Sequence, residues 1–190
     1  NHSDTEPVEI TVTISQASIA EAEVTLGGGS FTYTGSEQKP TVTVKVGEKT
    51  LTAGDYTVTY SGNCTDAGTY TVTVTGTGNY ADTATATYTI TPAELTITGA
   101  TLASKTYDGT KTATVTGVSF GDVTLAIGDD YTATAEFDIA DAGTNKTATV
   151  TVQLKNSNYM LMSSTYNLTG QTISKATYSG STGVSSTVLA

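Results

Sequence analysis

The chain lacks several of the residues on which protein chemistry usually depends. Its 190 residues include one cysteine (Cys64), one histidine (His2), no tryptophan and no arginine. A single cysteine excludes an internal disulfide, so this is not a disulfide-stapled scaffold. The formal net charge is −10, and all eight basic residues are lysines. A chain of this charge without a basic cluster would be repelled by phosphate backbones and anionic lipids, which argues against nucleic acid and membrane surfaces as partners.

Long apolar runs and helix-forming segments are also missing. No stretch is long and apolar enough to cross a membrane, and only residues 19–23 have a helix-forming composition, too short to stand alone. The chain starts at Asn1 without an initiator methionine or a signal peptide. We therefore expect a mature piece of a longer protein.

Threonine, valine and tyrosine are abundant in the sequence, and threonine alternates with the apolar residues. Such alternation places the apolar residues on one face of a strand and threonine on the other, which predicts strands with one buried and one wet face. Five segments show it clearly: 41–46, 56–60, 70–74, 85–90 and 147–152. Glycine- and aspartate-rich turns separate them at intervals of about 8 to 12 residues, a spacing typical of a sandwich or barrel.

The chain also repeats itself. Five landmarks recur in the same order, with offsets of 74 or 75 residues at the first three, 79 at the fourth and 83 at the last. They are Tyr33-Thr-Gly35 and Tyr107-Asp108-Gly109, Gly54-Asp55-Tyr56 and Gly128-Asp129-Asp130-Tyr131, Asp66-Ala67-Gly68 and Asp141-Ala142-Gly143, Asn79-Tyr80 and Asn158-Tyr159, and Ile90-Thr-Pro-Ala93 and Ile173-Ser-Lys-Ala176.

This repeat predicts two tandem modules, at 18–92 and 93–175, each a small all-β, Ig-like sandwich. A β-grasp-like module is the alternative, and it needs a helix that only residues 18–24 could supply. Residues 1–17 are expected to be the closing strand of a preceding repeat or an N-terminal extension, because Ile14-Ser-Gln-Ala17 repeats the last landmark. Residues 176–190 read as a flexible tail or the start of a truncated repeat. The direct passage from strand to strand at Pro92 predicts stiffly coupled modules.

Residues 105–176 resemble the YDG-type repeats of bacterial cell-surface proteins. The resemblance rests on Lys105-Thr-Tyr-Asp-Gly-Thr110, the strand 112–117, Gly121-Asp-Val-Thr-Leu125, 142–147 and Asn158-Tyr159. Residues 31–93 resemble the related Tyr-Thr-Gly repeats, of the mucin-binding-like MBG type, although Cys64 departs from their pattern. The resemblance implies β-rich adhesin-like modules without catalytic residues. Tyr33, Gly35, Tyr107, Asp108 and Gly109 are assigned structural roles in the repeat motif.

Catalysis finds little support in the residues. A nucleophile needs a base and an orienting group, and Cys64 has no histidine in its module. Paired carboxylates could perform glycoside chemistry, but the acidic residues recur at turns, where aspartate bonds nearby backbone N–H groups. A calcium site built from adjacent loops by Asp129, Asp130, Asp138 and Asp141 is a further hypothesis. An intramolecular isopeptide bond would need a buried lysine, for which Lys45 and Lys105 are the candidates; alternation turns Lys45 toward water.

Eleven tyrosines suggest carbohydrate binding, since aromatic faces stack on sugar rings. Tyrosines that recur in both copies are more simply core residues, whereas Tyr60, Tyr70, Tyr88 and Tyr178 are less constrained. The sequence thus favours a non-catalytic, monomeric stalk or adhesion region outside a bacterial cell. The alternative is a module that binds glycans or mucins through exposed tyrosines, and other surface proteins are possible partners.

Overall fold

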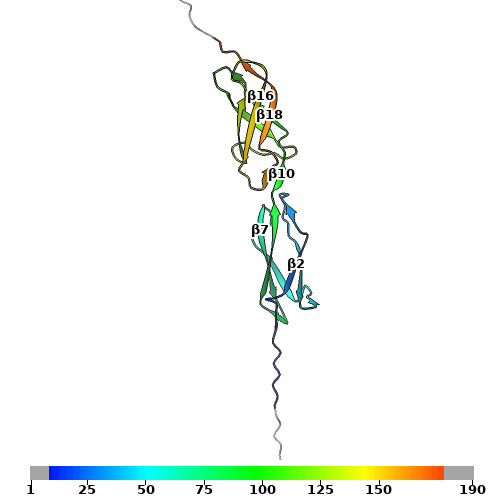
Figure 1. Cartoon of the computed structure of the whole chain (residues 1–190). Helices are drawn as coiled ribbons and strands as arrows, with labels where there is room; N and C mark the ends of the chain where they lie inside the picture. Colours follow the sequence, from blue (N-terminus) through cyan, green and yellow to red (C-terminus); the bar gives the residue numbers. More distant parts are fainter. Residues whose placement is uncertain (1–8, 178–190) are drawn as a thin grey trace, which may run out of the picture. The chain divides into compact units, whose positions relative to one another are not determined.

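The computed structural model describes residues 9–177, and these residues form strands and turns without a helix. They divide into two compact units, Asn1–Pro92 and Ala93–Ala190 (Figure 1). The all-β prediction is confirmed. The predicted tail at 176–190 lies almost wholly outside the described residues, as do residues 1–8.

The first unit is a sandwich of two sheets. A four-stranded sheet has the order β3 (Phe31–Thr32), β9 (Thr83–Thr91), β7 (Gly68–Gly76) and β6 (Tyr56–Tyr60). A three-stranded sheet contains β2 (Glu23–Gly27), β4 (Thr41–Val46) and β5 (Lys49–Thr50), and β1 (Ala17–Ser18) pairs separately with β8 (Tyr80–Ala81). Val44 of β4 and Val74 of β7 are fully buried in the same apolar cluster, which shows that the two sheets pack face to face.

The second unit repeats this plan with a larger sheet. Its five strands have the order β12 (Lys105–Thr106), β18 (Thr165–Ser174), β16 (Gly143–Leu154), β15 (Tyr131–Phe137) and β13 (Thr112–Ala113). Two further pairs complete it: β10 (Ala93–Leu95) with β17 (Tyr159–Leu161), and β11 (Gly99–Leu102) with β14 (Val115–Ser119). One core cluster gathers Leu95, Phe120, Tyr131, Val150 and Ile173.

The sequence repeat is also a structural repeat. β3 pairs with β9 in parallel through Phe31 and Ile90, and β12 pairs with β18 in parallel through Lys105 and Ile173. The antiparallel ladders β6–β7–β9 and β15–β16–β18 correspond as well. The late insertions of the second copy lengthen its strands: β16 has 12 residues where β7 has 9.

The predicted strands lie where the alternation placed them. All five alternating segments fall within β4, β6, β7, β9 and β16, and in β9 the side chains at 84, 88 and 90 are buried while the threonines between them are exposed. Residues 18–24, in contrast, contain the end of β1, a turn and the start of β2 rather than a helix. The helix that the β-grasp alternative requires is therefore absent from that segment.

Candidate functional site

The two Tyr-x-Gly motifs form the same turn in both units. The backbone N–H of Tyr33 donates to the carbonyl of Thr91, and that of Tyr107 donates to the carbonyl of Ser174, each at 2.8 Å. Gly35 and Gly109 follow with φ of 77° and 79°. Residues with a Cβ rarely adopt this left-handed region, which explains the glycine at both positions. The motif thus extends the parallel pairing of β3 with β9 and of β12 with β18 by one further hydrogen bond.

Asp108 holds the second turn together. Its Oδ1 accepts hydrogen bonds from the N–H and the hydroxyl of Thr110, both at 2.8 Å. Lys105 Nζ donates to both carboxylate oxygens at 2.8 and 2.9 Å, and the Lys105 side chain is only 8% exposed. The bonds from Lys105 and then from Thr110 hold the pKa of Asp108 well below its usual value. The first unit has Phe31 and Thr34 at the positions of Lys105 and Asp108, so this ion pair belongs to the second unit alone.

The hydrogen-bond partners of Lys105 do not support the isopeptide hypothesis. Its Nζ has hydrogen bonds to Asp108 and Thr110, with no asparagine among these partners. Lys45 is half-buried rather than turned fully to water, since it lies between Glu23 of β2 and Thr50 of β5 in the ladder.

Aspartates at the second landmark close equivalent turns. Asp55 Oδ2 accepts from the N–H and the hydroxyl of Thr52 (2.8 Å each), and these bonds lower the pKa of Asp55. Asp130 Oδ2 accepts from the N–H of Ala126 at 2.8 Å, and its Oδ1 accepts from Asn156 Nδ2 at 3.2 Å. Both carboxylates therefore satisfy backbone donors at a strand entry, which is the structural role that recurrence predicts.

The four calcium candidates do not converge. Asp129 and Asp130 precede β15, whereas Asp138 and Asp141 follow it. A strand of seven residues separates the two pairs by about 23 Å at 3.3 Å per residue. Calcium ligands lie 2.3 to 2.6 Å from the ion, so the four residues do not share one site. Within residues 9–177, no group of three or more histidine, cysteine, aspartate or glutamate side chains is placed to hold a metal.

Four of the eleven tyrosines are buried core residues. Tyr70, Tyr80, Tyr88 and Tyr131 are between 2% and 8% exposed. Tyr70 and Tyr88 stack with their ring centroids 5.5 Å apart, and Phe31 and Tyr60 meet Tyr88 edge-on. Hydroxyl groups reach carbonyl oxygens, from Tyr60 to Pro40 at 2.8 Å and from Tyr88 to Gln38 at 2.9 Å. These rings therefore pack within the fold, whereas Tyr107 is 44% exposed, and Tyr178 lies outside the described residues.

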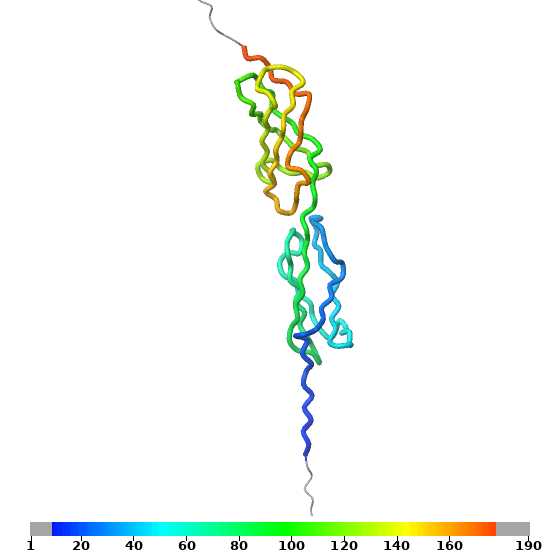
Figure 2. Tube along the Cα trace, in the orientation of Figure 1, coloured from blue at the N-terminus to red at the C-terminus, as the bar shows by residue number. Residues whose placement is uncertain are grey.

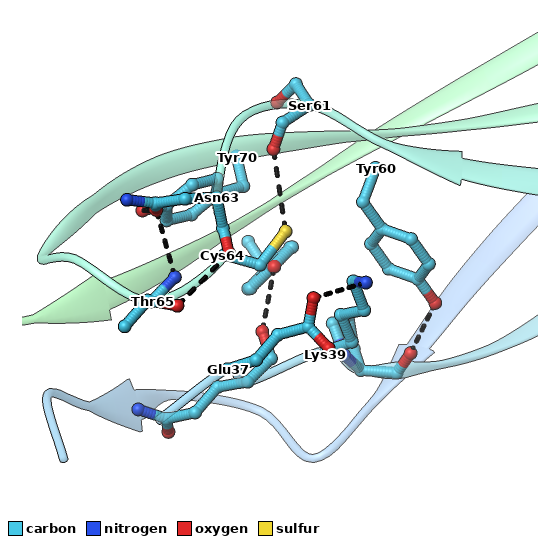
Figure 3. A network of polar contacts seen from close by, with 11 residues as sticks. Glu37, Lys39, Tyr60, Ser61, Asn63, Cys64, Thr65 and Tyr70 are labelled. Carbon is cyan, nitrogen blue, oxygen red and sulfur yellow. Dashed lines mark hydrogen bonds and ion pairs between the residues drawn. The ribbon is translucent and has the colours of Figure 1, made fainter. Parts of the chain in front are cut away.

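Cys64 lies in the loop between β6 and β7 (Figure 3), and its side chain belongs to this aromatic core. It is 1% exposed, has a φ of 54°, and its Sγ donates to the carbonyl of Ser61 at 3.5 Å. The thiol is buried in the same cluster as Tyr88. Burial is the main cause of a raised Tyr88 pKa, and the hydrogen bond with Cys64 adds to it. Because the thiol is buried, it is not placed to cross-link two chains.

Two of the hollows at the surface of the second unit differ in their lining. A shallow one of about 280 Å³ is lined by Tyr107, Ala142, Lys175 and Ala176, and Tyr107 is 44% exposed there. The other, of about 420 Å³, lies over the outer face of β15 and β16 and is lined mainly by threonines and Gln153. The sequence offers no signal for Lys175 or the threonine face, because outward threonines occur on nearly every strand.

Two β-sandwich modules with corresponding strand connections define a tandem β-repeat protein. The family comparisons agree with this class: the MBG domain model matches residues 20–98, and the YDG domain model matches residues 91–168. The two matches in tandem identify the chain as a YDG/MBG-like repeat module. Neither the curated proteins nor the solved structures contain a match.

No helix within residues 9–177 has the length and apolar character needed to span a membrane.

Proposed function

We propose that this chain is a non-catalytic structural and adhesion region of a secreted or surface-anchored bacterial protein. MBG domains are typically found in surface or secreted proteins, and MBG and YDG domains together suggest an adhesin-like repeat module. The supporting observation is the use of the repeated polar residues. Asp55 and Asp130, which recur at the second landmark, satisfy donors within their own turns, so this recurring chemistry serves the scaffold.

A role as spacer is supported by the junction between the units. β9 ends at Thr91 and β10 begins at Ala93, so Pro92 is the only residue between the last strand of one unit and the first of the next. Proline fixes its own φ near −65° and restricts the preceding residue. A linker this short leaves few conformations to the chain, which suits a repeat that holds other domains apart.

Weak multivalent binding is the second part of the proposal. The shallow hollow at Tyr107 presents a tyrosine ring beside the Lys175 side chain. Aromatic rings stack on sugars, and lysine donates hydrogen bonds to hydroxyls or to acidic groups of mucin glycans. Repeats of such a surface would increase avidity through effective concentration.

Binding of the bead-multimerised chain to a glycan and mucin array tests the second part. Tyr107→Ala removes the exposed ring, and Met162→Ala is the matched control, because Met162 is a 70% exposed apolar residue outside the hollow. Binding to one sugar class that Tyr107→Ala abolishes and Met162→Ala preserves would establish a recognition module. Absence of binding under these high-avidity conditions would leave the spacer role.

The same array with calcium and with a chelator tests the metal hypothesis independently. Because the four candidate aspartates lie at two ends of β15, we expect no dependence on calcium. Size-exclusion chromatography with light scattering tests the expected monomer.

A further inference from the structure

Residues 9–15 carry an apolar face that no strand covers. Ile10, Val12 and Ile14 are 79%, 79% and 93% exposed, and they alternate with polar residues that are also exposed. No strand pairing involves this segment within the described part of the chain. Figure 2 shows it as an extended trace that leaves the first unit without a neighbouring strand.

The repeat fixes which residues of the folded units correspond to this segment. The N–H of Ala17 donates to the carbonyl of Asn79, and the N–H of Ala93 donates to the carbonyl of Asn158, each at 2.9 Å. Each alanine then opens a parallel pair, β1–β8 or β10–β17. Ala17 and Ala93 are therefore equivalent, with an offset of 76 residues, and this offset aligns residues 9–15 with 85–91 of β9.

The aligned residues lie inside a sheet. β9 is paired on both edges, in parallel with β3 and antiparallel with β7. Ile90, the equivalent of Ile14, is fully buried, and Tyr88, the equivalent of Val12, is 5% exposed. The isoleucine recurs once more as Ile173 in β18, where it is 1% exposed. Thus Ile90 and Ile173, the two folded copies of this isoleucine, are core residues, whereas Ile14 is exposed.

We propose that residues 9–15 are the closing strand of a preceding module of the same class. In that module the segment would lie between the counterparts of β3 and β7, with Ile10, Val12 and Ile14 facing the core. The occupant of the apolar face is thus a β-sandwich that lacks its own last strand. The alternating pattern favours a sheet over a coil partner, since period two directs every apolar residue to one face. The inference rests on the repeat and is independent of any adhesive function.

A tandem fusion tests the proposal directly. Residues 17–82, which contain every strand of the first unit except β9, are joined to Pro7 of the full chain, so that residues 7–15 occupy the place of 83–91. A second fusion also carries Val12→Tyr, because Tyr88 fills an aromatic cluster at this position. We expect the backbone amides of residues 10–14 to gain at least about 100-fold protection from hydrogen exchange relative to the unfused chain.

Matched variants show whether the protection comes from the predicted face. In the fusion with Val12→Tyr, Ile14→Asp should abolish it, whereas Thr13→Asp should preserve it, because Thr89, the equivalent of Thr13, is exposed. A control fusion retains residues 83–91 in the added copy and lacks residues 7–15. If this control folds while residues 10–14 stay unprotected in both other fusions, the proposal is wrong.

A measurement on the unfused chain is a second test of the proposal. The proposal expects Ile14→Asp to leave the melting temperatures of both units unchanged, since the strand belongs to neither. A decrease in the melting temperature of the first unit would show that the segment packs on this chain's own sheet and would overturn the proposal.

Discussion

Replacing three equivalent isoleucines with alanine, one at a time, measures what the closing position contributes in each setting. Ile90 and Ile173 are 0% and 1% exposed, whereas Ile14 is 93% exposed. Truncating a buried isoleucine to alanine costs about 2 to 5 kcal/mol, because apolar contacts are lost and a cavity remains. An exposed residue without partners changes stability by less than about 0.5 kcal/mol.

These costs are large for modules of this size. At roughly 0.1 kcal/mol per residue, a unit of about 75 residues has a total free energy of unfolding of about 8 kcal/mol. A loss of about 3 kcal/mol lowers the melting temperature of such a domain by roughly 12 to 24 °C. We therefore expect Ile90→Ala to destabilise the first unit severely, Ile173→Ala the second, and Ile14→Ala neither.

Urea unfolding followed by hydrogen-exchange mass spectrometry distinguishes the two units within one chain. Each core variant should shift the midpoint of its own unit to lower urea with an unchanged slope, because the surface exposed on unfolding stays the same. The reasoning fails if Ile14→Ala destabilises the first unit as much as Ile90→Ala does. It fails equally if Ile90→Ala leaves that unit intact, since the exposure values would then not measure packing.

Three further perturbations address the polar and buried groups. Hydrogen bonds from Lys105 and Thr110 hold the pKa of Asp108 below its unfolded value of about 3.9, so the stabilisation they give is complete above that pH and is lost as the pH falls further. Asp108→Asn should therefore flatten the acid side of the plot of the second unit's stability against pH. Parallel plots for the variant and the parent chain would contradict this. Cys64, at 1% exposure, should react with a thiol reagent only in denaturant, and rapid labelling of the native chain would refute its burial. Tyr131→Phe removes the hydroxyl that accepts the N–H of Val118 at 3.1 Å, so it should cost the second unit about 1 to 3 kcal/mol in thermal unfolding, and an unchanged melting temperature would show that another acceptor replaces the hydroxyl.

The strands could be predicted because their information is local. Period two assigns each residue of β4, β7 or β9 to a face, and the faces of the structure follow it. The role of the turn aspartates could also be predicted, since each accepts from a backbone donor three or four residues away.

Other features depend on where the chain goes next and could not be predicted. The thiol of Cys64 turns inward because its φ is positive, and a turn of this kind leaves no reliable mark in a sequence without glycine at that position. The Lys105 side chain is buried because the loop that follows it brings the Asp108 carboxylate against its ammonium group. The acidic residues around β15 are close in sequence, yet an extended strand places them far apart.

The repeated motif at the module boundary shows why a sequence period and a folded unit need not coincide. In Ile90-Thr-Pro-Ala93 the isoleucine completes the sheet of the first unit, through its parallel pairing with Phe31, while the alanine opens the second unit, through its pairing with Tyr159. The two family matches overlap over residues 91–98, as expected when one motif serves both modules. The same division applies to Ile14 and Ala17: the alanine is paired within the first unit, and the isoleucine is bare. A motif divided in this way buries both of its parts where strands of two units meet, as at Ile90 and Ala93. Ile90 is therefore fully buried, whereas Ile14, which has no such pairing in the described residues, is 93% exposed.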